Sequence, residues 1–187
     1  MNRLSSSEKK VSMLLLAALT CIATMMIKLP TPDGRYVNLG DGFALASGIL
    51  FGPVYGALAA GAGSALSDLI NGYSHIAPAT FVIKALMATA TAVCYKLLTR
   101  NHIPDRYSYI NVSVSGAAGE TVMAAGYFIY SAISFIYENG RLNRSAVQSA
   151  VIYASGGLAF SLLQAAIGIA VAVIATPLLV RLITRSR

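Results

Sequence analysis

The chain has 187 residues, of which 56% are hydrophobic and only 11% are charged, with a net charge of +7. Soluble domains carry about 25% charged residues, so this composition excludes a water-soluble fold and predicts an integral membrane protein. The positive charge indicates membrane topology and no nucleic-acid partner, because the basic residues lie in short tracts beside apolar runs. At about 20 residues per span, the apolar material suffices for five or six helices and leaves no separate soluble domain.

Helix-breaking residues divide the apolar material into six expected spans. Pro30 and Pro32 end the first span, and Gly52-Pro53 separates the second from the third. Pro78 suits the start of the fourth span, since proline is favoured in the first helical turn. We therefore expect an all-α, six-helix bundle that forms one transmembrane domain over residues 1–187. Its spans are expected at about 10–27, 39–50, 54–70, 79–98, 109–137 and 158–183.

Polar connections are expected between these spans. They cover residues 28–37, 71–77, 100–106 and 138–145. Residues 146–156 are apolar and contain glycine, and they are expected to form an irregular approach to the last span. The first apolar run lacks a small-x-small cleavage site, so it is expected to be a retained helix and not a signal peptide.

The distribution of basic residues predicts the orientation in the membrane. With six spans, both termini and the loop after the fourth span share one side, which holds nine lysines and arginines against four on the other. The positive-inside rule then places both termini in the cytoplasm of a multi-pass cell-membrane protein. A five-helix alternative, with 39–70 as one continuous helix, would remove this asymmetry. The nine basic residues are Arg3, Lys9, Lys10, Lys96, Arg100, Arg106, Arg181, Arg185 and Arg187.

Four ionisable residues lie within or beside the spans, where charge is costly and tends to mark function or a paired partner. Asp68 and Lys84 fit either a structural ion pair or ligand contacts, and Asp41 fits a helix cap as well as a ligand contact. Glu120 has no evident partner at its expected depth and is therefore the strongest candidate for a ligand contact. Tyr127 follows on the same span, nearer its outer end. There its ring could stack on a planar ligand held in the outward-facing half of the bundle.

Small residues recur at helical spacing. Gly48, Gly52 and Gly56 repeat every fourth position, and Ala17 and Cys21 form a weaker pair in the first span. Such a face lets helix backbones approach closely in lipid. It fits internal packing of the bundle, and it also fits a docking face for another membrane protein.

Several kinds of chemistry have no support in the sequence. No Walker A motif occurs, and no Ser-His-Asp or paired-carboxylate arrangement can be argued. His75 and His102 are expected on opposite sides of the membrane, and no cysteine cluster accompanies them. Cys21 and Cys94 are expected at different depths, too far apart for a disulfide. We expect no enzyme activity, no cofactor and no metal site.

One block of motifs resembles a known family. It comprises Asn-Leu-Gly-Asp at 38–41, Gly-Pro-Val-Tyr-Gly at 52–56, Ser-Asp-Leu at 67–69 and Ala-Pro-Ala-Thr-Phe-Val-Ile-Lys at 77–84. These motifs resemble the substrate-binding S components of energy-coupling factor (ECF) vitamin transporters. The chain looks most similar to the hydroxymethylpyrimidine or pyridoxine type, with the riboflavin type as the alternative.

The resemblance implies a transport subunit that captures a vitamin outside the cell. It also implies a transmembrane coupling protein and two cytosolic ATPases as partners. The expected substrate-binding residues are Lys84, Glu120, Tyr127 and Gln164, which come from separate segments but share the expected outer half of the membrane, together with Tyr36 and Asn38 on the loop that the resemblance places over the site. The expected partner-docking residues are Ala17, Cys21, Gly48, Gly52 and Gly56. A self-sufficient secondary transporter is the competing function, although no inverted repeat of broken helices is evident, and an intramembrane enzyme is disfavoured for want of a catalytic constellation.

Overall fold

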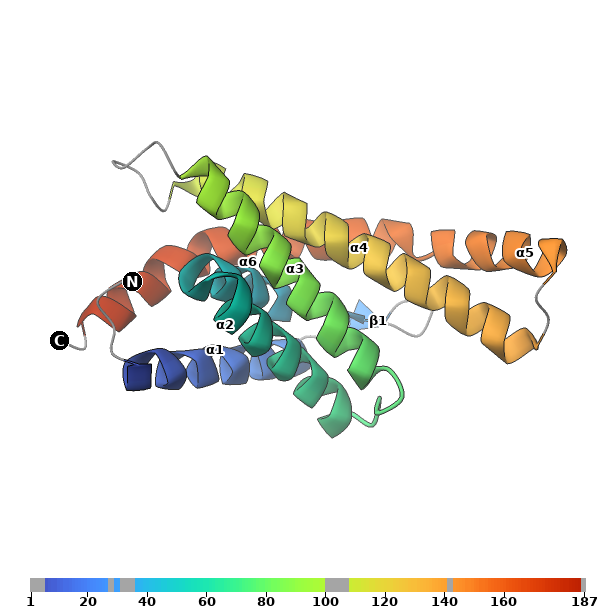
Figure 1. The fold of residues 1–187 in the computed structure, drawn as a ribbon, viewed down its shortest axis with the longest axis horizontal. Coiled ribbons are helices and arrows are strands. Elements are labelled where there is room, and N and C mark those ends of the chain that lie inside the picture. Colours follow the sequence, from blue (N-terminus) through green and yellow to red (C-terminus); the bar gives the residue numbers. More distant parts are fainter. Residues whose placement is uncertain (1–5, 27–28, 31–35, 100–107, 141–142, 186–187) are drawn as a thin grey trace.

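The computed structural model describes residues 6–26, 29–30, 36–99, 108–140 and 143–185, and it confirms an all-α bundle. The described helices, in chain order, are α1 (Ser6–Met26), α2 (Gly40–Ile70), α3 (Ala77–Leu98), α4 (Tyr109–Asn139), α5 (Arg144–Ser155) and α6 (Leu158–Arg185). Between α1 and α2, the two-residue strands β1 (Leu29–Pro30) and β2 (Tyr36–Val37) pair in antiparallel orientation. The start of α1 and the end of α6 lie at the same end of the bundle (Figure 1).

Helix α2 combines the second and third expected spans but is sharply kinked between them. Gly52 has φ 78° and ψ −173°, a conformation outside the helical region that glycine adopts without steric cost. The Ser47 hydroxyl lies 2.7 Å from the carbonyl oxygen of Ala44 and 2.9 Å from that of Gly56, and so links the two arms. The helix breaks at Gly52, as Gly52-Pro53 predicts, and residues 39–70 therefore do not form one straight helix.

The turn from α2 to α3 follows from its sequence. The N–H groups of Gly72 and Tyr73 donate to the carbonyl oxygens of Leu69 and Asp68, at 3.2 and 2.8 Å. With φ of 83° at Gly72, these two bonds form a Schellman motif, which satisfies the carbonyl groups at the helix end. Pro78 then lies in the first turn of α3, as the sequence predicts.

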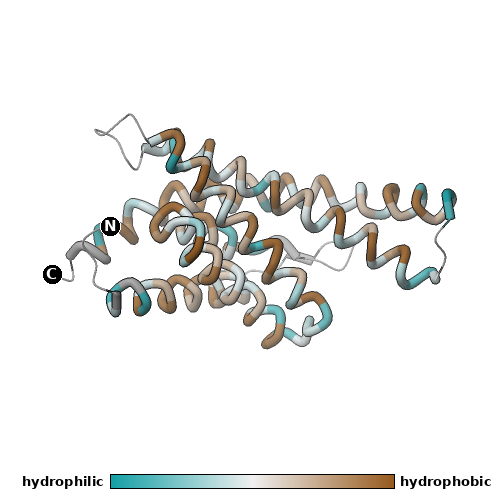
Figure 2. The backbone as a smooth tube through the Cα atoms, viewed as in Figure 1, coloured by the Kyte–Doolittle hydropathy of each residue, from teal (hydrophilic) through white to brown (hydrophobic). Residues whose placement is uncertain are grey.

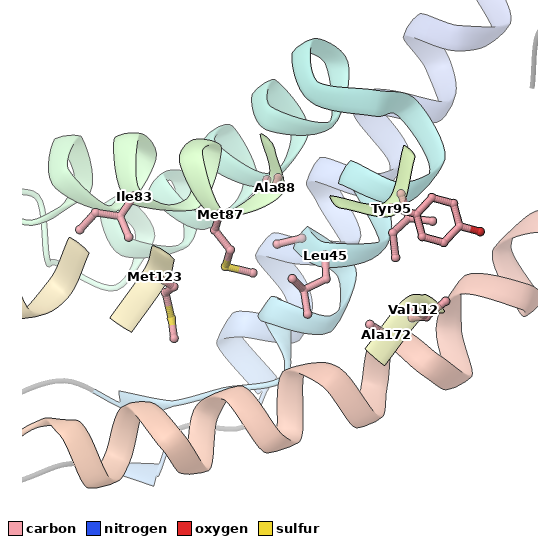
Figure 3. Close-up of a cluster of buried hydrophobic side chains, with 11 residues drawn as sticks. Leu45, Ile83, Met87, Ala88, Tyr95, Val112, Met123 and Ala172 are labelled. Carbon is pink, nitrogen blue, oxygen red and sulfur yellow. The ribbon is translucent and has the colours of Figure 1, made fainter. Parts of the chain in front are cut away.

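The main core lies where α2, α3, α4 and α6 meet (Figure 3). Leu45, Met87 and Met123 are almost fully buried there. Close approach of backbones creates this contact, because a Cβ at Gly48 would collide with the backbone of Ala88, and Gly56 packs on Gly48. A second cluster, built around Leu16 and Leu50, joins α1 to α2 and the end of α6.

The outer surface of the helices is apolar. Val82, Leu86, Val93 and Leu97 lie along one side of α3 and are all exposed by 46% or more. Figure 2 shows hydrophilic segments mainly near helix ends and turns, with apolar residues along the helix lengths. Within the described residues, three helical stretches are long and apolar enough to cross a membrane: Gly40–Ile70, Ala77–Leu98 and Arg144–Leu182. This surface is typical of a lipid-facing bundle.

The region before α6 departs from the sequence-based expectation. Residues 144–155, expected as part of a loop and an irregular approach, form helix α5, which packs along α4 (Figure 1). The Asn143 side chain accepts a hydrogen bond from the Ala146 N–H at 2.8 Å and caps the helix. Ala150 and Ala154 are buried one turn apart. An N-cap asparagine followed by alanines at helical spacing was the pattern that could have predicted α5.

Candidate functional site

A buried ion pair joins α2 to α3. Lys84 comes from α3, seven residues after its start, and Asp41 comes from the first turn of α2. Lys84 Nζ donates to Asp41 Oδ1, and the two side chains are only 6% and 1% exposed. At about 1.5 Å per residue, Lys84 lies about 10 Å along the axis from the start of α3. Taking both charges out of water is costly, and the pairing offsets part of that cost.

Glu120 on α4 lies beside this pair. It is 2% exposed, and neither of its carboxylate oxygens has a hydrogen-bond partner among the described residues. A Cβ at Gly168 would collide with Glu120 Oε1 and would lie 3.0 Å from Asp41 Cβ. Gly168, on α6, therefore lets the two acidic side chains and the α6 backbone come together. Asp41 Oδ2 also has no hydrogen-bond partner there, so this charged cluster (Asp41, Lys84 and Glu120) holds two carboxylates for one ammonium group.

Tyr127 lies about two turns further along α4, seven residues after Glu120. Lys84 Nζ is 5.5 Å from the centroid of its ring, within the range of a cation–π contact. Its hydroxyl oxygen is 3.4 Å from Thr80 Oγ1 on α3. The tyrosine ring thus forms an aromatic wall on one side of the charged cluster.

The segment that enters α2 is tied to α6. The Asn38 N–H donates to Gln164 Oε1 at 2.7 Å, and Gln164 Nε2 donates to the Asn38 carbonyl oxygen at 2.8 Å. Asn38 Oδ1 in turn accepts from the Gly40 N–H at 2.8 Å. Asn38 therefore supplies an acceptor to the first N–H group of α2, and Gln164 ties Asn38 to α6.

Several predicted site residues lie close together in the structure, and some of them have partners other than the expected ones. Lys84 on α3 lies close to Tyr127 on α4, and Glu120 on the same α4 lies beside Asp41, the partner of Lys84. The buried ion pair joins Lys84 to Asp41 and not to Asp68, and Asn38, not Asp41, accepts the hydrogen bond at the start of α2. The amide of Gln164 is engaged by the backbone of Asn38.

Two further tyrosines lie on other elements. Tyr36 lies in β2, and its side chain is outside the described residues. Tyr153 on α5 packs on Phe135 of α4, with ring centroids 5.1 Å apart.

Most of the predicted docking residues are buried within the bundle. Cys21, Gly48 and Gly56 are buried, whereas Ala17 and Gly52 are partly exposed. A Cβ at Gly63 of α2 would collide with the carbonyl oxygen of Ala17. Internal packing therefore accounts for most of this small-residue pattern. Both cysteines are free, in line with the expected lack of a disulfide.

An apolar helical bundle with a charged cluster buried where four helices meet defines a multi-pass membrane protein with a polar site near one end. The family model described as "ECF-type riboflavin transporter, S component" matches residues 5–184. The chain belongs to this family of ECF transporter S components.

A curated relative from Pyrococcus woesei, described as "Uncharacterized protein in gap 3'region", is 34% identical over 107 residues. The matched segment covers 57% of this chain and 66% of the relative, which is just under two thirds.

Proposed function

We propose that this protein is the vitamin-binding subunit of an ECF-type importer and that its ligand lies against the charged cluster of Asp41, Lys84 and Glu120. The observation that carries the proposal is Glu120, a buried carboxylate without a hydrogen-bond partner among the described residues. A buried unsatisfied polar group costs about 1–3 kcal/mol, a cost that a bound ligand would recover. Buried ionisable groups in a membrane protein tend to mark substrate sites.

The proposed ligand is a small planar vitamin or vitamin precursor, with hydroxymethylpyrimidine or pyridoxine as the first choice. Tyr127 supplies an aromatic face, Lys84 and Glu120 supply charged edges, and the segment containing Tyr36 and Asn38 covers the site. Gln164 holds that segment in place through Asn38. Riboflavin is the second candidate, favoured by the description of the matching family.

The proposed partners are a transmembrane coupling protein and two cytosolic ATPases. Ala17 and Gly52 are the proposed docking positions that retain partial exposure. Cytoplasmic termini are part of the same proposal, supported by the nine-to-four distribution of basic residues.

The test uses the full chain, purified and reconstituted in liposomes. We expect it to bind one of the three vitamins tightly and to take up none of them until the coupling protein and ATPases are added with ATP. Mass spectrometry of the ligand that co-purifies would identify the vitamin directly. ATP-independent uptake by the chain alone would refute the proposal and favour a secondary transporter.

A further inference from the structure

The charged cluster has an excess of hydrogen-bond acceptors. Three of its carboxylate oxygens, both of Glu120 and Oδ2 of Asp41, are buried without a partner among the described residues. The ammonium group of Lys84 already donates to the remaining oxygen, Asp41 Oδ1. With both acids ionised, the formal charge of the cluster is negative.

The position of Glu120 limits how its carboxylate can be satisfied from within the chain. Gly168 of α6 packs against Oε1, and it offers no side chain. The nearby Tyr127 hydroxyl is engaged with Thr80, and the nearby amide of Gln164 is engaged with Asn38. These two side chains are engaged elsewhere, and both Glu120 oxygens lack a partner among the described residues, so a bound ligand with donor groups would satisfy them.

Resting on the proposed function, we infer that the ligand presents an amidine-type edge to Glu120, meaning an amino N–H beside a ring nitrogen that can carry a proton. Such an edge donates two parallel hydrogen bonds to one carboxylate, the geometry that makes charge-assisted pairs strong. A ligand with acceptors at this edge would instead face three unpaired carboxylate oxygens. Glu120 is therefore the residue that determines specificity, and Tyr127 contributes ring stacking to any planar ligand.

The inference separates the candidate vitamins by their chemistry. An aminopyrimidine such as hydroxymethylpyrimidine carries the required amino group and ring nitrogen. Pyridoxine has hydroxyl groups but no amino group on its ring. The imide edge of riboflavin offers one N–H flanked by two carbonyl oxygens, which would repel the carboxylates.

The experiment measures the affinity of the full purified chain for four probes. They are 4-amino-5-hydroxymethyl-2-methylpyrimidine, its 4-oxo counterpart, pyridoxine and riboflavin. Leaving a buried polar group unpaired costs about 1–3 kcal/mol, which corresponds to about 5- to 150-fold in affinity. We expect the aminopyrimidine to bind more tightly than the 4-oxo compound by a factor in that range.

Glu120→Gln tests the residue itself, because the neutral amide keeps the shape of the side chain. We expect it to weaken aminopyrimidine binding by about 5- to 150-fold and to leave binding of the 4-oxo compound unchanged or improved. Thr121→Val is the matched control, since Thr121 is the next residue on α4, is exposed and bonds only the Ala117 carbonyl oxygen. It should alter neither affinity.

The possible failures are distinguishable. If the 4-oxo compound, pyridoxine or riboflavin binds as tightly as the aminopyrimidine, or if Glu120→Gln binds it like the wild type, the inference is overturned while the proposed function stands. If the wild type binds none of the four probes, the proposed function fails as well. If Glu120→Gln does not fold, the affinities of the wild type for the aminopyrimidine and for its 4-oxo counterpart still test the inference.

Discussion

Replacing Glu120 by methionine should stabilise the ligand-free protein, although Glu120 is one of its most deeply buried polar residues. Methionine has a similar length and leaves the Asp41–Lys84 pair electrically balanced. The substitution removes two buried oxygens without partners, and such a group costs about 1–3 kcal/mol. For chains of this length, 1 kcal/mol changes the thermal midpoint by about 2–4 °C. The expected rise is therefore about 2–12 °C.

A thiol-reactive fluorescent dye provides the assay, because Cys21 is buried and Cys94 is partly buried. Both become accessible when the bundle unfolds in detergent. Ligand must be removed first, since a bound ligand raises the midpoint of the wild type by mass action. Heating rates must match, because unfolding of this kind is often irreversible.

Gln164→Leu is the comparison variant, because Gln164 is also buried but both ends of its amide make hydrogen bonds. Its loss would leave the N–H and carbonyl groups of Asn38 without their partners, so the midpoint should fall. A midpoint for Glu120→Met at or below the wild-type value would refute the reasoning. It would show that Glu120 stabilises the ligand-free bundle, which contradicts the view that its carboxylate is satisfied only by a ligand.

Two further predictions concern charge balance and topology. Lys84→Met should lower the thermal midpoint more than Asp41→Asn does. The first substitution leaves two buried carboxylates without a cation, whereas the second leaves Lys84 beside the carboxylate of Glu120. Losing one partner of a buried pair costs about 3–5 kcal/mol. The opposite order of midpoints would contradict the charge count. In a cysteine-free background on intact cells, an impermeant thiol reagent should modify Asn143→Cys, which is exposed at the turn before α5, and should spare Asn101→Cys; the reverse labelling would invert the topology.

Much of the fold could be predicted from local sequence. The apolar runs are long enough for helices, and the helices begin and end near the expected residues because proline and glycine act within a turn of their own position. The break at Gly52-Pro53 and the proline at the start of α3 are effects of this kind. The sequence did not predict helix α5 because two local features stabilise it: the Asn143 cap and the buried Ala150 and Ala154 that face α4. Such features give a weaker sequence signal than a long apolar run.

The sequence by itself determined that charged residues would lie inside an apolar bundle, and it placed Lys84 on one helix and both Glu120 and Tyr127 on the next. Only the tertiary structure decided their partners. Whether Lys84 pairs with Asp41 or Asp68 depends on the rotation and depth of each helix, and the contact across Gly168 depends on how closely α6 approaches. These distances arise from the packing of residues far apart in the chain. Helical periodicity defines which face a residue occupies, but not which residue of another helix lies opposite it.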